Sequence, residues 1–165
     1  ASIQINLRIY LFILTVFVSI TCFSQEDKLN EIRKCFKKIE CTCMIEKLIN
    51  MTENDLENPV VLAYNYTGNL MMLDYSNNPF EKYKVFKLKT RQIDSIVDTN
   101  PKNIEIRLLR YVVQKNSPYF LRYKSDLNND LMYIKSNLHK EKEYLQVYIK
   151  NLLHKFNNER SRNPS

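Results

Sequence analysis

Glycine is the residue whose scarcity most restricts how this chain can fold, because Gly68 is the single glycine among 165 residues. Tight β-hairpins and phosphate-binding loops rely on glycine, which adopts a positive φ without steric cost. A β-sandwich, a dinucleotide-binding α/β domain and a P-loop enzyme are therefore disfavoured. The length suits one domain with its own core, and no segment alternates polar and apolar residues with the period of a strand. We therefore predict an all-α fold.

The first 24 residues have the character of a secretory signal peptide. Arg8 precedes an apolar stretch over residues 9–23, which is shorter than the ~20 residues that a membrane-spanning helix needs. We predict cleavage between Ser24 and Gln25 and export of the remaining chain, either to the periplasm or out of the cell. Two alternatives stay open: lipidation of Cys22, and an uncleaved segment that anchors the protein to a membrane.

Apolar residues recur at three- and four-residue steps through most of the remaining chain, as in amphipathic helices. This pattern predicts about six helices, over residues 27–50, 58–75, 80–98, 104–115, 119–138 and 140–156. The fourth is apolar around much of its circumference, which predicts a central position. We expect one domain over residues 25–156, in which antiparallel helical hairpins pack as a tetratricopeptide-like array or an irregular bundle. The polar residues 157–165 are predicted to form a disordered tail.

Several large apolar residues fall at helical steps that predict an inward position. On the third and sixth predicted helices these are Tyr83, Phe86, Ile93, Val97, Tyr144, Val147, Tyr148, Leu152 and Phe156. Ala63, Thr67 and Gly68 on the second predicted helix are small, and small residues at such spacing let another helix approach closely. Asn58, followed by proline, and Asn103 or Asn100 are typical of helix starts.

Residues 98–107, Asp-Thr-Asn-Pro-Lys-Asn-Ile-Glu-Ile-Arg, resemble the junction between two tetratricopeptide-type helical hairpins. Further motifs cover roughly the middle half of the chain: Ala-Tyr at 63–64, Asn-Pro-Phe at 78–80, Pro-Lys-Asn-Ile-Glu-Ile-Arg at 101–107 and Pro-Tyr-Phe-Leu at 118–121. In this order they are similar to a family of small exported helical proteins of Bacteroidota-type bacteria, which has no assigned activity. The resemblance implies a helical fold and export, but no reaction. The chain departs from the family pattern at the glycine-favoured positions of Tyr66, Lys89 and Arg122.

Glu105, Arg107 and Arg110 form the densest charged group on a predicted apolar helix. The two arginines are three residues apart and share a side of this helix, while Glu105 lies nearer the apolar face. Two guanidinium groups beside a carboxylate are able to bind an acidic ligand or a peptide terminus. In the alternative interpretation, which is the commoner arrangement in proteins, Glu105 bonds to a neighbouring helix and the arginines bridge packed helices.

Three cysteines follow the predicted signal peptide, at Cys35, Cys41 and Cys43. On a continuous helix over residues 27–50, Cys35 and Cys43 share a face and Cys41 points away. Residues two apart in a helix do not satisfy disulfide geometry, so we expect no bridge between Cys41 and Cys43. We expect these cysteines to pack in the core, with a thiol that pairs between chains or binds metal as the alternative. Their spacing lacks the pattern of a zinc site, and we expect no metal.

The residues needed for catalysis are sparse. The two histidines, His139 and His154, lie among polar residues, and no spacing singles out a pair of acidic residues. We therefore expect neither an enzyme nor a cofactor. The formal charge of +7 is spread along the chain and interleaved with acidic residues, which favours solvated helix faces over a polyanion-binding surface. The aromatic residues fall at helical steps, which favours a core role over nucleic-acid binding.

These observations predict a protein-interaction or scaffold module that binds a protein partner in the cell envelope. The expected binding residues are Tyr119, Phe120 and Tyr123 as aromatic anchors and Glu105, Arg107 and Arg110 as charged contacts. One alternative is a carrier of a small molecule or a lipid, in which the apolar helices enclose a pocket. Another is a secreted helical signalling protein with glycans at Asn50 or Asn65. Membrane contact is expected only through an uncleaved signal segment.

Overall fold

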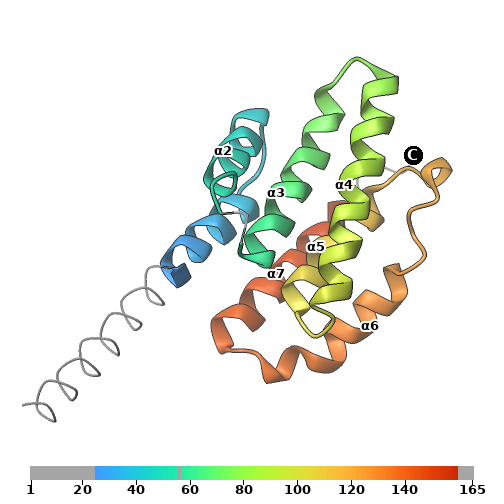
Figure 1. The fold of residues 1–165 in the computed structure, drawn as a ribbon. Coiled ribbons are helices and arrows are strands. Elements are labelled where there is room, and N and C mark those ends of the chain that lie inside the picture. The colour runs from blue at the N-terminus through green and yellow to red at the C-terminus, as the bar shows by residue number, and fades with distance from the viewer. Residues whose placement is uncertain (1–24, 56, 160–165) are drawn as a thin grey trace, which may run out of the picture.

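A computed structural model describes residues 25–55 and 57–159, in which every regular element is a helix (Figure 1). The α-helical elements are a segment at residues 25–37, α2 (Thr42–Thr52), α3 (Pro59–Met72), α4 (Pro79–Thr99), α5 (Ile104–Asn116), α6 (Leu127–Asn137) and α7 (Glu143–Glu159). Short 3-10 helices occur at η1 (Leu73–Tyr75), η2 (Tyr119–Leu121) and η3 (Leu138–Lys140). The predicted all-α class is confirmed. The predicted signal peptide at 1–24 lies outside the described residues.

Asparagine side chains begin three consecutive helices. Asn58, Asn78 and Asn103 are the N-caps of α3, α4 and α5, and each Oδ1 accepts hydrogen bonds from two backbone N–H groups of the first turn. Proline follows Asn58 and Asn78, at the helical position where its missing N–H group costs nothing. The caps satisfy donors that have no partner inside the helix, which explains why the predicted starts near these residues are confirmed.

The centre of the fold is formed by α3 and α5. Each helix from α2 to α6 packs against the next one along the chain, as expected for helical hairpins, and α3 also packs against α5 (Figure 1). All residues of α5 from Ile104 to Gln114 are buried except Arg107, which confirms the predicted central helix. The one glycine, Gly68, lies against α2, where an added Cβ would come within 3.2 Å of the side chains of Leu48 and Ile49.

The predicted helix over residues 27–50 is wrong between residues 38 and 41, where the chain leaves the helical path. The first segment ends at Lys37, and α2 begins at Thr42 after an extended Cys41 with φ −145° and ψ 163°. Phe36 before the break and Leu48 after it are buried in the same core cluster. The apolar periodicity therefore continues across the break, which concealed it in the sequence.

The predicted helix over residues 119–138 is also wrong, because its first part is the short helix η2 followed by a turn. Arg122 ends η2 in the left-handed region, with φ 51° and ψ 35°, and this conformation stops a right-handed helix. Glycine adopts such a conformation at the least steric cost, which gives a physical reason for a glycine-favoured position there. Regular helix resumes at α6, so Tyr119 and Phe120 do not continue the apolar face of that helix.

Three residues predicted to point inward are exposed instead: Tyr83 at 51%, Tyr144 at 42% and Val147 at 51%. The other members of those two apolar faces, such as Phe86, Ile93 and Leu152, are buried as predicted. The predicted disordered tail is wrong for residues 157–159, which belong to α7. Residues 160–165 lie outside the described part of the chain.

Candidate functional site

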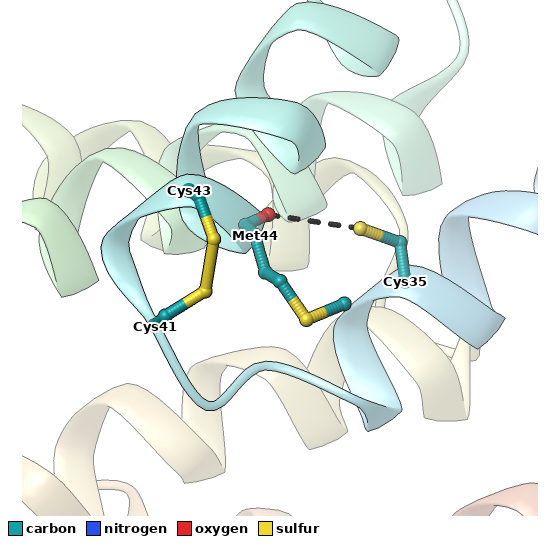
Figure 2. Close-up of a disulfide and its surroundings, with 4 residues drawn as sticks. All are labelled: Cys35, Cys41, Cys43 and Met44. Atoms are coloured by element: carbon teal, nitrogen blue, oxygen red, sulfur yellow. Dashed lines mark hydrogen bonds between the residues drawn. A yellow bond between two sulfur atoms is a disulfide. The ribbon is translucent and has the colours of Figure 1, made fainter.

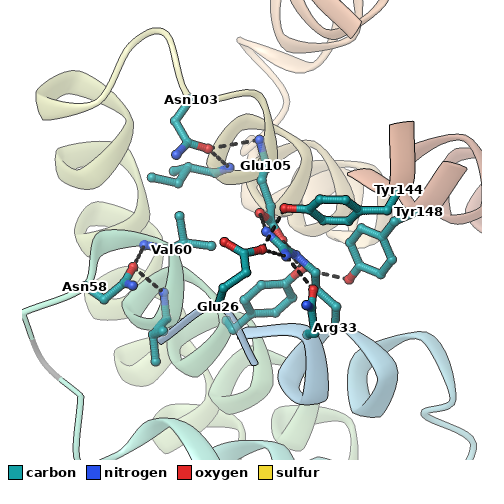
Figure 3. Close-up of polar contacts among 12 residues, drawn as sticks. Glu26, Arg33, Asn58, Val60, Asn103, Glu105, Tyr144 and Tyr148 are labelled. Atoms are coloured by element: carbon teal, nitrogen blue, oxygen red, sulfur yellow. Dashed lines mark hydrogen bonds and ion pairs between the residues drawn. The ribbon is translucent and has the colours of Figure 1, made fainter. Parts of the chain in front are cut away.

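Glu105 forms a buried ion pair that joins residues 25–37 to α5 (Figure 3). Its carboxylate accepts hydrogen bonds from Nε and Nη2 of Arg33, both at 2.8 Å. Oε1 also accepts a hydrogen bond from the Tyr64 hydroxyl at 2.7 Å, and this hydroxyl shares another 2.7 Å hydrogen bond with that of Tyr148. Glu105 is 3% exposed and Arg33 is 6% exposed. One carboxylate therefore connects residues from four helices.

The outer side of Arg33 is also fully engaged. Its Nη1 donates hydrogen bonds to Glu26 at 3.0 Å and Asn30 at 2.8 Å, and its guanidinium lies over the ring of Tyr144. The hydrogen bond from the Tyr144 hydroxyl lowers the pKa of Glu26. Burial disfavours the charged form of Arg33, but the hydrogen bonds and charge of Glu105 outweigh it and raise the pKa of Arg33. The guanidinium is therefore charged and held in place.

Arg107 and Arg110 converge on Asp130 of α6, which is 0% exposed. Arg110 donates hydrogen bonds to it from Nε at 2.7 Å and from Nη2 at 2.9 Å, and Arg107 donates one from Nη1 at 2.7 Å. Arg107 also donates to the carbonyl of Pro101 at 2.7 Å and lies over the ring of Tyr133. Asp130 is in the first turn of α6, where the helix dipole favours a negative charge.

The structure thus divides the predicted charged site between two ion-pair clusters. Glu105 bonds to another helix and the two arginines bridge α5 to α6, as the alternative interpretation of the sequence describes. Their basic and acidic partners, Arg33 and Asp130, were not singled out in the sequence. Because these donors and acceptors are engaged inside the protein, the charged residues contribute to holding the helices together.

Two buried tyrosines, Tyr64 and Tyr148, and the half-buried Tyr123 predict that the fold is lost at alkaline pH. Burial raises the pKa of Tyr64, Tyr123 and Tyr148 above the value of about 10 expected in the unfolded chain. As the pH rises past that value, the unfolded state loses protons first, so stability that is present at lower pH is lost. We expect the phenolate absorbance of these tyrosines to appear together with the loss of helical circular dichroism. Full tyrosine ionisation with an intact helical spectrum would contradict this expectation.

An apolar pocket of about 430 Å³ lies between α3, α4, α5 and η2. Its apolar lining comprises Leu70, Met71, Leu73, Pro79, Tyr83, Phe86, Val112, Val113, Pro118, Phe120, Leu121 and Phe156. Its polar lining comprises Thr67, Asp74, Lys82, Asn116 and Ser117. Leu70, Phe86 and Val113 belong to a small core cluster beside α4 that is separate from the main core. The volume and the mainly apolar lining are typical of ligand-binding sites.

Five exposed aromatic residues line this pocket or adjoin a lining residue in the sequence. They are Tyr75, Phe80, Tyr83, Tyr119 and Phe120, with exposed fractions between 51% and 86%, and we call them the aromatic rim. Tyr83 and Phe120 line the pocket, and the other three are sequence neighbours of lining residues. Large aromatic side chains bury much surface when a partner covers them, so a cluster of exposed ones indicates a binding surface.

The three aromatic residues predicted as binding anchors differ in position. Tyr119 and Phe120 are 86% and 78% exposed on η2, and Phe120 lines the pocket. Tyr123 is half-buried instead, where its ring packs edge-on against Phe86 and its hydroxyl donates a 2.8 Å hydrogen bond to Asp94. Tyr123 therefore supports the wall of the pocket and joins η2 to α4.

A second, more polar hollow of about 500 Å³ lies between residues 25–37 and α7. It is lined by Asp27, Asn30, Glu31, Arg33, Lys34, Lys37, Tyr144, Val147, Tyr148 and Asn151. The buried cation at its base, Arg33, is already bonded to Glu26, Asn30 and Glu105. The apolar pocket is therefore the stronger candidate for a binding site.

Cys41 and Cys43 form a disulfide at the start of α2, so the expectation of no bridge between them is wrong (Figure 2). Two cysteines at this spacing do not bridge on a continuous helix, but here Cys41 is the extended N-cap residue and only Cys43 is helical. Cys35 is a free, buried cysteine, as expected for core packing, and its Sγ donates a 3.7 Å hydrogen bond to the carbonyl of Met44. Burial raises the pKa of Cys35.

Within residues 25–55 and 57–159, no helix has the length and apolar character to cross a membrane, and no group of three or more His, Cys, Asp or Glu side chains is arranged to hold a metal ion. The fold and site define an all-α protein with a preformed apolar pocket and an exposed aromatic rim. No family model, no curated protein and no solved structure matched this chain.

Proposed function

We propose that this protein is an exported binding module that uses the apolar pocket and the aromatic rim to hold a segment of a protein partner in the cell envelope. The observation that carries this proposal is the position of exposed aromatic side chains beside a preformed apolar pocket. A partner's apolar side chain would fill the pocket, and the rim would contact the flanking residues. Such a central apolar anchor is where binding energy concentrates in protein interfaces. Export is proposed from the sequence of residues 1–24 alone.

The chemistry of the partner segment follows from the charge beside the pocket. Residues 79–91 of α4 include five basic residues and one acidic residue, Glu81, so their net charge is +4. Lys82 of α4 lines the pocket itself, and the one acidic lining residue, Asp74, is in η1. We therefore propose a segment in which an aromatic or large aliphatic anchor is flanked by acidic residues, because complementary charge speeds association and favours the correct partner.

Selection from a displayed random-peptide library against the full chain tests this proposal. We expect the selected peptides to carry an apolar anchor with acidic neighbours. Substitution Phe120→Ala should weaken binding of these peptides by about tenfold, which corresponds to the loss of a moderate anchor contact. Substitution Lys82→Glu should also weaken binding, and the loss should be largest for the peptides with the most acidic residues.

The matched control for this experiment is Met132→Ala. Met132 is also a large exposed apolar residue, at 65%, but it belongs to α6 and does not line the pocket. We expect this variant to bind the selected peptides as the original chain does. Equal binding by the Phe120 variant and the original chain would refute the proposed site.

A small apolar or lipid ligand is the second candidate, and the volume and mainly apolar lining of the pocket favour it. Native mass spectrometry of the purified protein distinguishes the two proposals. A stoichiometric co-purified molecule that is lost in the Phe120→Ala variant would favour the carrier function. One of the two glycan acceptors of the proposed signalling protein, Asn65, is a poor site for a glycan. It is 9% exposed, and its Nδ2 donates a 3.0 Å hydrogen bond to Thr52.

A further inference from the structure

The Cys41–Cys43 disulfide lies at the surface, away from the apolar pocket. Cys43 is exposed in the first turn of α2, and Cys41 is half-buried at the end of the connection between residues 25–37 and α2 (Figure 2). Neither cysteine lines the apolar pocket or the polar hollow. An accessible disulfide is open to attack by an external thiolate. Since neither cysteine lines the pocket, this chemistry is independent of the proposed binding function.

This disulfide is poorly suited to stabilising the fold. A disulfide restricts the unfolded chain more strongly as the loop that it closes becomes longer. Here the bonded residues are only two apart in the sequence, so the closed loop contains one other residue, Thr42. It also joins no two helices, because both cysteines belong to the start of α2. A structural role therefore explains little of its presence.

Two features favour the thiolate form of Cys43 when the bridge is reduced. Cys43 is in the first turn of α2. This turn contains no acidic residue, the nearby Glu46 being in the next turn, and no side chain caps it among the described contacts, so its backbone N–H groups lack a side-chain acceptor. Lys47 is four residues further along α2, which places its charge on the same helix face as Cys43. A helix N-terminus and a nearby cation both stabilise a cysteine thiolate.

We propose that Cys41 and Cys43 form a thiol–disulfide exchange site whose substrates are accessible dithiols and disulfides of peptides or proteins. In the oxidising direction, a substrate thiolate attacks Sγ of Cys43, and the S–S bond breaks to release the Cys41 thiolate. The second thiolate of the substrate then attacks the substrate sulfur that is bonded to Cys43, which forms the substrate disulfide and releases the Cys43 thiolate. The substrate gains a disulfide and loses two electrons, and the cysteine pair gains two electrons. The two protons of the substrate thiols pass to the pair or to solvent.

The same two steps in reverse restore the disulfide with a second peptide or low-molecular-weight disulfide as the oxidant. Cys43 is then the attacking thiolate, and Cys41 resolves the mixed disulfide. The third cysteine takes no part in these steps, because Cys35 is 7% exposed and burial raises its pKa, which keeps it in the thiol form. Cys43 is the more exposed cysteine of the pair, so its sulfur is the one that contacts the substrate.

Reaction of the reduced protein with glutathione disulfide tests this assignment. The full chain with Cys41→Ser is compared with the full chain with Cys43→Ser, and peptide mass spectrometry locates each mixed disulfide. The reference is a synthetic peptide of residues 39–45 with the same serine substitution. We expect Cys43 in the folded chain to react about two- to fivefold faster than in its peptide, as the effect of a helix N-terminus predicts. Substitution Lys47→Glu should slow the reaction in the folded chain. The peptide ends at residue 45 and does not contain this lysine.

The unsubstituted protein provides a second measurement that does not depend on a variant. The oxidised chain is mixed with a peptide dithiol, and the thiols are trapped by alkylation. We expect one substrate disulfide to form for each reduced Cys41–Cys43 pair, with Cys35 unlabelled in the folded chain. A bridge that stays oxidised under these conditions, or a Cys43 that reacts no faster than its peptide, would overturn the proposal.

Discussion

Substitution Glu105→Gln is expected to lower the free energy of unfolding by about 3–5 kcal/mol, because it leaves the buried guanidinium of Arg33 without its main counter-ion. Glutamine keeps the size of the side chain and an acceptor for the Tyr64 hydroxyl, so the effect isolates the charge. The two bonds from Arg33 to Glu105 are both 2.8 Å long, and both side chains are almost fully buried. Urea unfolding followed by circular dichroism measures the change.

The control for this prediction is Glu31→Gln on the same helical segment. Glu31 pairs with Lys34 at 2.8 Å, but both side chains are exposed, and exposed pairs contribute little to stability. We expect no measurable change for this variant. Glu26 remains as a partly exposed partner of Arg33, so the double variant Glu26→Gln, Glu105→Gln should be less stable than Glu105→Gln alone. A Glu105 variant as stable as the original chain would show that the ion pair does not stabilise the fold.

Substitution Asp130→Asn is expected to lower the free energy of unfolding by a similar amount, about 3–5 kcal/mol, because it also removes a buried counter-ion. Here one carboxylate with no solvent exposure is the counter-ion of two guanidinium groups, those of Arg107 and Arg110. Arg110 keeps only a longer contact to Asp94, at 3.4 Å. Because these ion pairs tie α6 to α5, amide hydrogen exchange should rise first in α6.

The conservative control for Asp130 is Asp98→Asn, an exposed residue near the end of α4. We expect this variant to unfold at the same urea concentration as the original chain. Faster exchange throughout the protein, without a preference for α6, would mean that Asp130 stabilises the whole core rather than the junction of two helices. Unchanged stability of the Asp130 variant would contradict the prediction directly.

Helix caps and residue composition were sufficient to predict the fold class and the start of some helices. The caps at Asn58 and Asn103 and the near absence of glycine placed α3, α5 and the all-α class correctly. The break at residues 38–41 was missed because the apolar period continues across it. The left-handed Arg122 was also missed, since only the surrounding structure compensates for a positive φ at a residue with a side chain.

The candidate site was less predictable, because its parts come together only in the folded chain. Arg33 and Glu105 are 72 residues apart, and no sequence pattern connects them. Tyr119 and Phe120 were predicted as binding residues and are exposed beside the pocket, whereas Tyr83 was predicted to face the core. The pocket lining is drawn from α3, α4, α5 and α7 and from the short helices η1 and η2, so its volume depends on packing that apolar periodicity does not encode.

The docking of residues 25–37 has a consequence for the order of maturation. Gln25 is already helical, Glu26 accepts a 2.6 Å hydrogen bond from Tyr144, and Arg33 is tied to Glu105. The proposed peptidase cut between Ser24 and Gln25 would therefore fall beside described residues that are helical and fastened to the rest of the protein. Under the proposal of a cleaved signal peptide, trimming would come before residues 25–37 dock, or these residues would unwind to admit the peptidase. Processing and the final folding step would then compete for the same few residues.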